Sequence, residues 1–354
     1  MSFRVMLRPS GHFFEVQEGN TILAAGLASG RFLPYSCRTG VCNTCKARVV
    51  EGAVDHGMVL KTYLSDDARA QGYALLCSAK PLSDVVIEVA ELEGMAAIKP
   101  KIYPCRVTRM ERAAPDVMVL TLRMPMNETM QFMAGQYIEM ILPEGERRNY
   151  SIATAPAIDG LPHIELHIRH VPGGAFTDRV FSALKERDVL RFEGPFGTFF
   201  LREESDKPML MLASGTGFGP IKSIVEYAIK KRINRRIEIY WGGRRKQDLY
   251  MMALAQSWAA AHANISFYPV LSDPTPGCEW TGEIGYVHRV VMDHHPDLSG
   301  YQVYACGAPA MVDSARRDFV ERCRLPAQDF FADSFLTAVE KAGAGGPLTS
   351  KETT

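Results

Sequence analysis

Four cysteines in the first quarter of the chain have the spacing of metal ligands. Cys37, Cys42 and Cys45 lie in the stretch Y-S-C-R-T-G-V-C-N-T-C, with the spacing C-x4-C-x2-C, and Cys77 follows after 31 intervening residues. Three thiolates from one loop and a fourth from elsewhere in the chain are the ligand pattern of a [2Fe-2S] cluster. The sequence therefore predicts that these four cysteines bind an iron–sulfur cluster.

Such a loop must also bend tightly around its ligand. Backbone N–H groups turn inward toward the sulfur atoms of a cluster, much as they surround an anion in a backbone nest. Gly40 tolerates the unusual backbone angles that this requires, because it has no Cβ atom. Asn43 tolerates the left-handed region as well, because its side chain is short and polar. Both residues therefore suit a loop that encloses a cluster.

Two other uses of these cysteines are alternatives to a cluster. A structural zinc site normally shows two closely spaced pairs of Cys or His, whereas Cys77 stands alone in the apolar stretch A-L-L-C-S. A pair of disulfides is typical of a small secreted domain. The N-terminal residues 3–7 alternate like a strand and lack the features of a signal peptide, so we expect no secretion.

Composition narrows the classes of protein to which the chain can belong. Its 354 residues have room for two or three domains, and its 47% hydrophobic and 23% charged residues are typical of a soluble globular protein. The 40 basic and 40 acidic residues cancel, so we expect no nucleic-acid partner. No apolar run reaches the roughly 18 residues of a membrane span, so we expect no membrane association. A cytoplasmic location is the expectation, with cysteines serving as ligands or free thiols.

The first 93 residues show the alternation of a small sheet. Strands are expected at residues 3–7, 13–16, 46–50 and 85–89, with a helix after Thr21. Within this frame, P-Y-S-C-R-T-G-V-C together with Cys77 resembles the plant-type ferredoxins, many of which carry a glycine at the position of Asn43. The resemblance implies a ferredoxin domain with the β-grasp fold over residues 1–93.

A second domain is expected after a short linker. Residues 94–101 contain two alanines and end in K-P-K, and this change in composition is interpreted as a linker. Beyond it, alternating segments predict strands at residues 105–110, 117–123, 136–142, 163–169 and 189–192, and a helix at 177–184. Closely spaced strands of this kind favour a small antiparallel β-barrel, which we assign to residues 102–205.

Two motifs of the barrel segment carry groups that could bind a flavin nucleotide. In R-N-Y-S, the Arg148 guanidinium could bind a diphosphate, the Tyr150 ring could lie on a flavin ring, and the Ser151 hydroxyl could bind its edge. In G-G-A-F-T, the glycines let backbone N–H groups approach a phosphate at a helix start. An Arg and a Tyr on a strand also occur as a solvated charge and a packing ring, so the pairing of the two motifs carries the prediction.

The two motifs resemble the RxYS and GGxxS/T motifs of the ferredoxin-NADP reductase family, whose members bind a flavin. The resemblance implies FAD as the cofactor, although the sequence alone does not distinguish FAD from FMN. The binding residues that it implies are Arg148, Asn149, Tyr150, Ser151, His167, Ile168, Arg169, Gly173, Gly174, Ala175, Phe176 and Thr177.

The rest of the chain alternates between strands and helices. An apolar strand at residues 209–213 runs into S-G-T-G-F-G-P and a helical pattern, which is the phosphate-binding opening of a doubly wound α/β domain. Further strands are expected at residues 237–241, 265–270, 303–306 and 329–332, with helices between them. This alternation predicts a parallel sheet with helices on both faces over residues 206–338. Residues 339–354 are small, polar and charged, which predicts a disordered tail.

Three short segments of this domain could hold a nicotinamide, since open parallel sheets bind ligands at the carboxyl ends of their strands. By the family resemblance, Thr216, Cys306 and Asp333 would line the hydride-transfer site, and Phe335 would cover the flavin face until the nicotinamide displaces it. A buried small hydrophobe is the alternative for Cys306, and a core aromatic is the alternative for Phe335. The cofactor-binding turn that the resemblance implies comprises Gly215, Thr216 and Gly217.

The choice between NADH and NADPH depends on a pair of arginines. Arg244 and Arg245 follow the second predicted strand of this domain, where the adenosine ribose is expected. They could meet a 2′-phosphate or form a solvated pair before Asp248. The family members that the chain resembles in domain order use NADH, so NADH is the expected cofactor and NADPH the alternative.

Apart from the tail, the whole chain resembles the one-component reductases of bacterial multicomponent oxygenases, and also the reductase of CDP-6-deoxy-glucoseen biosynthesis. The resemblance implies a monomeric enzyme that passes electrons from NADH through FAD and the cluster to a terminal oxygenase. The expected oxygenases are Rieske-type enzymes that hydroxylate aromatic rings. Reduction of a deoxysugar-forming enzyme is the alternative, and an electron carrier or redox sensor without turnover is a third. The loop residues Arg38, Thr39, Val41 and Asn43 are expected to contact the acceptor.

Overall fold

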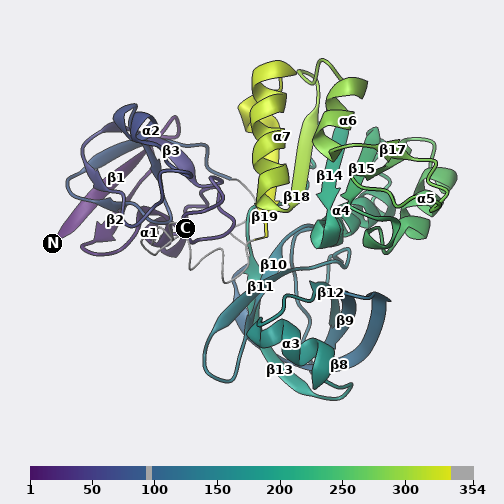
Figure 1. Ribbon diagram of the computed structural model, residues 1–354. Coiled ribbons are helices and arrows are strands. Elements are labelled where there is room, and N and C mark those ends of the chain that lie inside the picture. The colour runs from purple at the N-terminus through teal and green to yellow at the C-terminus, as the bar shows by residue number, and fades with distance from the viewer. Residues whose placement is uncertain (93–97, 336–354) are drawn as a thin grey trace, which may run out of the picture. The chain divides into compact units, whose positions relative to one another are not determined.

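The computed structural model of the protein describes residues 1–92 and 98–335 (Figure 1). The described residues form two compact units, one within Met1–Ile98 and one within Lys99–Phe335. Residues 94–97 of the predicted linker and the predicted disordered tail, 339–354, lie outside the described residues. The predicted domain boundaries therefore stay predictions.

The first unit is built on a mixed five-stranded sheet with the strand order β2-β1-β7-β3-β5. β1 and β7 are parallel, and the other neighbouring strands are antiparallel. Helix α1 packs against the sheet, and the Thr21 hydroxyl caps its first turn by accepting a hydrogen bond from the Ala24 N–H. The elements of this unit are β1 (Ser2–Arg8), β2 (Phe13–Gln17), α1 (Ile22–Ala28), β3 (Lys46–Glu51), β4 (Val54–Asp55), α2 (Asp66–Ala70), β5 (Tyr73–Leu75), β6 (Lys80–Pro81) and β7 (Val85–Glu88).

The core of this unit follows from the alternation of its strands. Val5 and Leu7 of β1 and Val16 of β2 are fully buried in one cluster with Ile22 of α1. The four predicted strands and the helix are confirmed. The elements β4, α2, β5 and β6 were not predicted, because segments of two to five residues are too short to show a period.

The second unit begins with a six-stranded antiparallel sheet in the order β11-β10-β13-β8-β9-β12. A further bridge between Ile152, which follows β11, and Leu166 of β12 connects the two edges, so the sheet closes into the predicted barrel. Side chains from all parts of the sheet fill one core, together with helix α3. The elements are β8 (Lys101–Ala114), β9 (Val117–Arg123), β10 (Tyr137–Ile141), β11 (Arg147–Ser151), β12 (His163–Arg169), α3 (Ala175–Ser182) and β13 (Val189–Phe196).

One barrel strand was not predicted. β11 contains the R-N-Y-S motif, and none of its five residues is fully buried. An alternation of apolar and polar residues marks a strand only where one face is buried, and β11 has no such face. The strand is held by its antiparallel pairing with β10 instead.

A six-stranded parallel sheet, which with its helices we call the α/β module, completes the second unit. Its strand order is β17-β16-β15-β14-β18-β19, and every neighbouring pair is parallel, as the sequence predicted. The elements are β14 (Met209–Ser214), α4 (Phe218–Lys230), β15 (Ile237–Gly243), α5 (Met252–Ala261), β16 (Ile265–Leu271), β17 (Glu283–Ile284), α6 (Val287–His294), β18 (Gln302–Gly307), α7 (Pro309–Arg322) and β19 (Phe330–Ser334).

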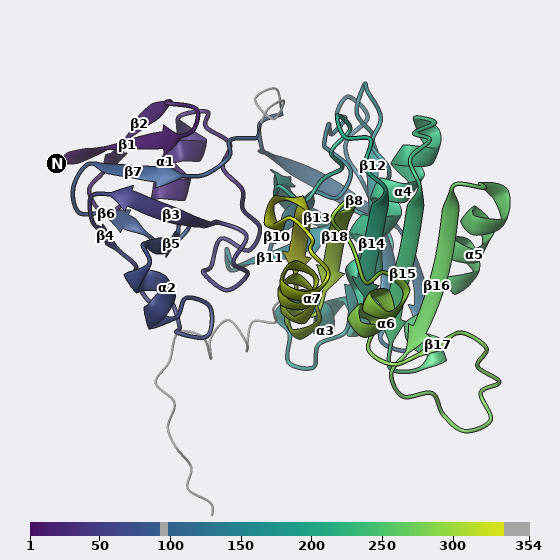
Figure 2. The same cartoon turned by 90° about the horizontal axis from the view of Figure 1, so that it is seen from above.

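Helices cover both faces of this sheet, which makes the module doubly wound (Figure 2). On one face, Phe218 and Ile221 of α4 and Trp258 of α5 share a core with the strands. On the other face, Val291 of α6 and Phe319 of α7 form a second core. Two separate cores explain why the central strands are apolar throughout rather than alternating.

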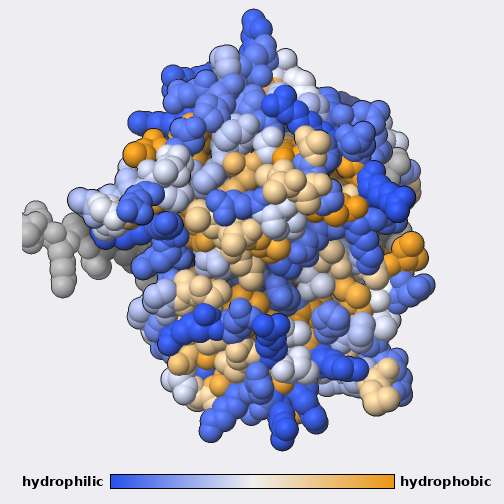
Figure 3. Space-filling model, turned by 90° about the vertical axis from the view of Figure 1, so that its right-hand side faces the viewer, coloured by the Kyte–Doolittle hydropathy of each residue, from blue (hydrophilic) through white to orange (hydrophobic). Residues whose placement is uncertain are grey.

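The surface drawn in Figure 3 carries hydrophobic residues in patches among hydrophilic ones. Within the described ranges, 1–92 and 98–335, no helix has both the length and the apolar composition to cross a membrane.

Candidate functional site

The cysteine loop adopts the backbone that a cluster requires. Arg38, Gly40 and Asn43 have positive φ angles of 59°, 79° and 57°, so Asn43 occupies the left-handed region that its short polar side chain tolerates. Gly40 has a second role, because a Cβ atom there would lie 2.9 Å from the Ser78 hydroxyl oxygen. The glycine therefore allows the loop to pass close to the segment that carries Cys77.

Backbone N–H groups point at the sulfur atoms of this loop. The N–H of Thr39 lies 3.4 Å from the Cys37 sulfur, and the N–H of Cys37 lies 3.5 Å from the Cys42 sulfur. Donors of this kind stabilise thiolates and tune a cluster that they bind. A hydrogen bond from the Cys42 thiol, added to those from Thr39 and Val41, lowers the pKa of Cys37 to about 5, although burial opposes it.

The four cysteines approach one another as two pairs. Cys37 lies against Cys42, and Cys45 lies against Cys77. No group of three or more His, Cys, Asp or Glu side chains in the described part of the chain is arranged to hold a single metal ion, and none of the eight cysteines is joined in a disulfide. Two thiolate pairs fit a cluster of two iron atoms better than one tetrahedral zinc ion.

One expectation for this loop is wrong. Val41 was expected to contact the acceptor, but it is 4% exposed and packs between Cys37 and Cys42 in a small apolar cluster. Arg38 and Thr39 are exposed, and Asn43 is half-buried. A single apolar residue in a polar loop carries no signal that distinguishes packing beside the cysteines from exposure.

The R-N-Y-S motif lies on the barrel edge strand β11, where Arg148, Asn149, Tyr150 and Ser151 are all half-buried. The Arg148 guanidinium lies 2.5 Å from the Glu146 carboxylate, and the Tyr150 ring lies 5.3 Å from the Phe176 ring. Burial raises the pKa of Tyr150, so its hydroxyl stays protonated. A half-exposed strand with a guanidinium, a ring and a hydroxyl fits a flavin nucleotide.

The G-G-A-F-T motif forms the start of helix α3. Gly173 has a φ of 79°, and a Cβ atom at Gly174 would lie 2.5 Å from the Thr177 hydroxyl oxygen. The Thr177 hydroxyl donates to the Val171 carbonyl oxygen at 2.9 Å, so it holds the loop in this shape. Phe176 is 1% exposed in the barrel core, whereas Ala175 is exposed. The motif therefore offers backbone N–H groups at a helix N-terminus, which suits a phosphate.

Two glycine turns meet at the carboxyl ends of β14 and β18. A Cβ atom at Gly217 would lie 2.2 Å from the Cys306 carbonyl oxygen, and one at Gly307 would lie 2.2 Å from the Ser214 hydroxyl oxygen. The sheet order changes direction between these two strands, which is where open α/β sheets bind their ligands. Thr216 is half-buried at the tip of the first turn, Gly215–Gly217.

The carboxyl ends of β18 and β19 carry further predicted residues of this site. Cys306 is paired with Asp333 across the two strands, and burial, with a contribution from Asp333, raises the pKa of the Cys306 thiol. The Phe335 N–H donates to the Gly307 carbonyl oxygen at 2.9 Å, and its ring packs at the edge of the core formed by α4 and α5. Thr216, Cys306, Asp333 and Phe335 are thus brought together.

The two predicted sites also meet each other. The Ser151 hydroxyl of the barrel donates to the Asp333 carboxylate of the α/β module at 3.2 Å. A ligand held by R-N-Y-S and a ligand held against the two glycine turns would therefore be neighbours. This geometry is what transfer of a hydride between two bound rings requires.

The predicted flavin-binding residues in the segment His163–Arg169 face in different directions. Ile168 is fully buried in the barrel core. The His167 ring is enclosed by Tyr250 and Glu165, and the Arg169 guanidinium lies by Gly215 and 3.0 Å from Asp116. Burial lowers the pKa of His167. The Ile168 and His167 side chains are thus engaged within the protein.

Comparison with known proteins matches three segments of the chain to domain families. Residues 5–82 match the family described as the 2Fe-2S iron-sulfur cluster binding domain. Residues 104–201 match the oxidoreductase FAD-binding domain, and residues 211–317 match the oxidoreductase NAD-binding domain. The chain is also 42% identical to the CDP-6-deoxy-L-threo-D-glycero-4-hexulose-3-dehydrase reductase of Yersinia pseudotuberculosis, over 95% of this chain and 99% of the relative. The chain belongs to the family of one-component flavin iron–sulfur reductases.

Other relatives of the reductase serve oxygenases. It is 35% identical to the reductase component of phenol 2-monooxygenase from a Pseudomonas species, with 97% of each chain covered. It also resembles the crystal structure of the Amycolatopsis cytochrome P450 reductase GcoB, with a TM-score of 0.74, 32% identity and coverage of 95% and 99%. The protein is an NAD(P)H-dependent flavin iron–sulfur oxidoreductase, and its cofactors are a [2Fe-2S] cluster, FAD and NAD(H).

Sequence reasoning missed one group of residues at this site. Lys222 and Tyr250 of the α/β module contact Glu165 and His167 of β12. The only signal was on the barrel side, where polar Glu165, His167 and Arg169 alternate with apolar residues. Such alternation predicts a polar face without saying what covers it.

Proposed function

We propose that the reductase passes electrons from NADH through FAD and the [2Fe-2S] cluster to a separate terminal oxygenase. The observation that supports it best is the contact between Ser151 and Asp333, because it joins the flavin motif to the nicotinamide motif. When bound, FAD takes up two electrons as a hydride and releases them singly, and the cluster carries one electron at a time. NADH rather than NADPH is the proposed donor.

The residue roles in this proposal follow the position of each side chain. Arg148 and the backbone N–H groups of the first turn of α3, after Gly173 and Gly174, would bind the FAD phosphates, since the N–H groups of the two glycines already donate to Asp178 and Val171. Asn149, Tyr150 and Ser151 would contact its ring system. Thr216, Cys306 and Asp333 would position the nicotinamide. Phe335 would shield the flavin before the nicotinamide enters. Cys37, Cys42, Cys45 and Cys77 would hold the cluster.

A second acceptor is favoured by a separate observation. The identity of 42% over 99% of the hexulose dehydrase reductase exceeds the 35% shared with the phenol monooxygenase reductase component. A deoxysugar-forming dehydrase that needs electrons is therefore the second candidate. Both acceptors would receive electrons from the same cluster, so the two proposals differ in the partner alone.

Stopped-flow mixing can decide between the acceptors. The reductase is reduced anaerobically with NADH and mixed with a Rieske-type aromatic-ring oxygenase or with a CDP-hexulose dehydrase, while the visible absorbance of the cluster is followed. Rapid reoxidation by one partner, and not by the other, identifies the acceptor. If NADH reduces neither ferricyanide nor cytochrome c in the presence of the reductase, the chain is an electron carrier or sensor without turnover, and the proposal is wrong.

The docking surface of the acceptor is proposed to include Arg38 and Thr39, which are exposed on the cysteine loop. A charge reversal, Arg38→Glu, is expected to slow reduction of the acceptor several-fold and to weaken the dependence of that rate on salt. Reduction of ferricyanide by NADH should stay unchanged. We also propose a monomer in the reducing cytoplasm, which size-exclusion chromatography and cell fractionation can test.

A further inference from the structure

Strand β12 presents two different faces along its length. Ile164, Leu166 and Ile168 point into the barrel core and are fully buried. The side chains between them point the other way, because successive residues of a strand alternate. Glu165 and His167 therefore lie toward helix α4 of the α/β module, which runs beside β12 in Figures 1 and 2.

From Glu165 to Arg169, the polar face of β12 is covered by the α/β module. Glu165 lies 3.3 Å from the Lys222 ammonium group of α4. Two residues further along the strand, the His167 Nδ1 atom lies 2.7 Å from the Tyr250 hydroxyl. At the end of the strand, a Cβ atom on Gly215 would lie 2.8 Å from the Arg169 guanidinium. The strand beside the flavin motif is thus joined to the turn that would hold the nicotinamide.

The His167 ring sits in a hydrogen-bonded chain with a defined direction. Its side chain is 1% exposed, and its Nε2 atom lies 3.0 Å from the Glu165 carboxylate. Burial lowers the pKa of His167 and raises the pKa of Tyr250, so the ring is neutral and the phenol protonated. A carboxylate only accepts, so Nε2 carries the proton and Nδ1 accepts from the Tyr250 O–H.

The Tyr250 ring continues this chain toward the glycine turn. It meets the Trp241 ring edge-on, at 5.2 Å and 90°, and Trp241 stacks on Phe218 at 3.8 Å. The Trp241 indole N–H donates to the Gly215 carbonyl oxygen at 3.1 Å. The Trp241 and Phe218 rings are fully buried, and the partly buried Tyr250 ring packs against the same core, so a shift at Tyr250 is passed to the turn.

We propose that Tyr250 is a positioning residue for hydride transfer. Through His167 it is tied to the flavin barrel, and through Trp241 to the carbonyl of Gly215 in the nicotinamide turn. It thereby sets the distance between the two bound rings, on which hydride transfer depends steeply. This inference rests on the proposed transfer from NADH to FAD, and it assigns to Tyr250 a role in the rate of that transfer more than in NADH affinity.

The test is the variant Tyr250→Phe, which keeps the ring and removes only the hydroxyl. Flavin reduction is followed by stopped-flow absorbance over a range of NADH concentrations. We expect the limiting rate to fall by about tenfold, the apparent Kd for NADH to change by less than about threefold, and the long-wavelength charge-transfer absorbance to weaken. The matched control is Tyr227→Phe on α4, whose hydroxyl donates to exposed Glu203 and should leave all three values unchanged.

A second measurement does not depend on turnover. Backbone amides of residues 215–219 should exchange with deuterium faster in Tyr250→Phe than in the wild type, because Tyr250, which supports the turn through Trp241, is no longer tied to His167 of the barrel. The wild-type rate of exchange would contradict the proposal, as would an unchanged limiting rate of flavin reduction. A wild-type flavin that NADH does not reduce would instead contradict the proposed function.

A double variant tests whether Tyr250 acts through His167. His167→Phe removes the acceptor for the Tyr250 hydroxyl, while Glu165 keeps the Lys222 ammonium group as its partner. If the two residues act together, the double variant His167→Phe, Tyr250→Phe should reduce its flavin no more slowly than His167→Phe alone. Effects that multiply would show that Tyr250 acts independently of His167 and would overturn the proposed path.

Discussion

At the scale of single residues, neighbouring side chains on one strand have different tasks. Arg147 and Arg148 are adjacent on β11 and therefore point to opposite sides. Arg147 binds the Glu139 and Glu193 carboxylates within the barrel, whereas Arg148 lies on the face of the flavin motif with Glu146 as its only carboxylate partner in the described ranges. The two arginines look equivalent in the sequence, but Arg147 is held within the barrel, whereas Arg148 is placed to bind the flavin nucleotide.

Arg148→Ala is expected to weaken FAD binding by about 10- to 100-fold, because a charge-assisted hydrogen bond contributes about 1.5–3 kcal/mol. The ratio of FAD to protein after size-exclusion chromatography measures this directly. Arg147→Ala removes a guanidinium from the same strand and is the matched control that should keep its FAD. A stoichiometric flavin content in Arg148→Ala would contradict the assigned role.

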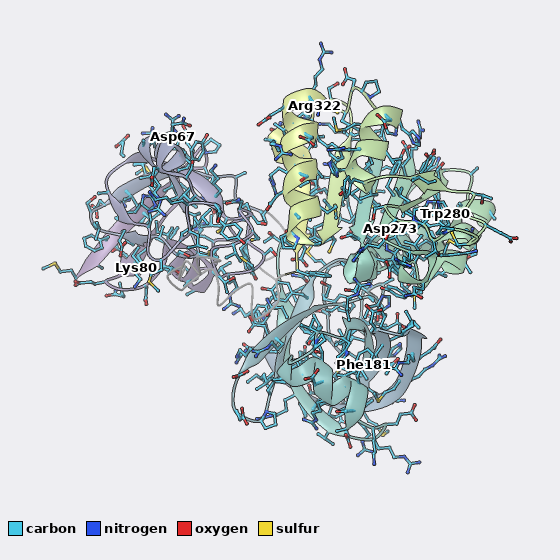
Figure 4. All side chains as sticks on the ribbon, in the orientation of Figure 1. Asp67, Lys80, Phe181, Asp273, Trp280 and Arg322 are labelled. Carbon is cyan, nitrogen blue, oxygen red and sulfur yellow. The ribbon has the colours of Figure 1, made fainter. Side chains whose placement is uncertain are left out.

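The proposed preference for NADH is supported by Asp273, which Figure 4 labels in the α/β module. Its carboxylate lies 3.4 Å from the Arg245 guanidinium and 4.0 Å from that of Arg244. The pair of arginines that could meet a 2′-phosphate is thus already neutralised in part. Because these groups are exposed, the contacts contribute little to stability.

Asp273→Asn should therefore raise kcat/KM for NADPH by about fivefold, as expected for about 1 kcal/mol from an exposed charged contact. The value for NADH should change by less than twofold. The thermal midpoint is the internal control, since an exposed pair should barely move it. If kcat/KM for NADPH does not respond, the two arginines lie away from the ribose.

At the scale of elements, the sequence predicted those strands and turns that a local residue pattern determines. The apolar run of β14 and the glycine turn after it identified the opening of the α/β module, and the alternation of β12 located that strand to the residue. β11 was missed because a half-exposed edge strand has no apolar period. The contacts of Tyr250 were missed because they join residues 83 positions apart, and no local pattern specifies such a pair.

Gly217 tests how closely the elements of the nicotinamide site must approach. Its φ of −59° is available to any residue, so a substitution causes no backbone strain and only the added Cβ matters. That atom would lie 2.2 Å from the Cys306 carbonyl oxygen. Gly217→Ala should destabilise the α/β module by about 3 kcal/mol and weaken NADH binding more than tenfold.

Thermal unfolding and NADH titration measure these effects. Gly300→Ala is the control, because a Cβ atom there meets nothing within 4 Å, and it should stay within about 0.5 kcal/mol of the wild type. Equal behaviour of the two variants would mean that β14 and β18 separate easily enough to admit a methyl group.

At the scale of the whole molecule, the module that carries the four cysteines has a core of its own. The core around Val5 and Ile22 draws only on residues of the first unit, whereas the two cores of the α/β module share its strands and one of them includes Phe199 and Leu201 of the barrel segment. Loss of the cluster should therefore leave the flavin chemistry intact. The acceptor itself was not predictable, because a docking surface is selected by its partner and not by the fold that carries it.

Cys42→Ser is expected to abolish the cluster absorbance and to lower reduction of the acceptor protein more than about 100-fold, because a buried iron ligand is lost. Reduction of ferricyanide by NADH should stay above about half of the wild-type rate. Cys105→Ser is the control, since Cys105 is buried in the barrel and donates to the Leu190 carbonyl oxygen. Loss of both activities in Cys42→Ser would show that the modules are not independent.

The two faces of β12 also bear on how such reductases can be recombined. A chimera that exchanges the α/β module between relatives would leave Glu165, His167 and Arg169 behind in the barrel, facing foreign partners. Such hybrids should bind every cofactor and still transfer hydride poorly. Transferring these three side chains together with the module should restore hydride transfer. All three lie on one face of β12, and the opposite face of that strand belongs to the barrel core, which the exchange leaves unchanged.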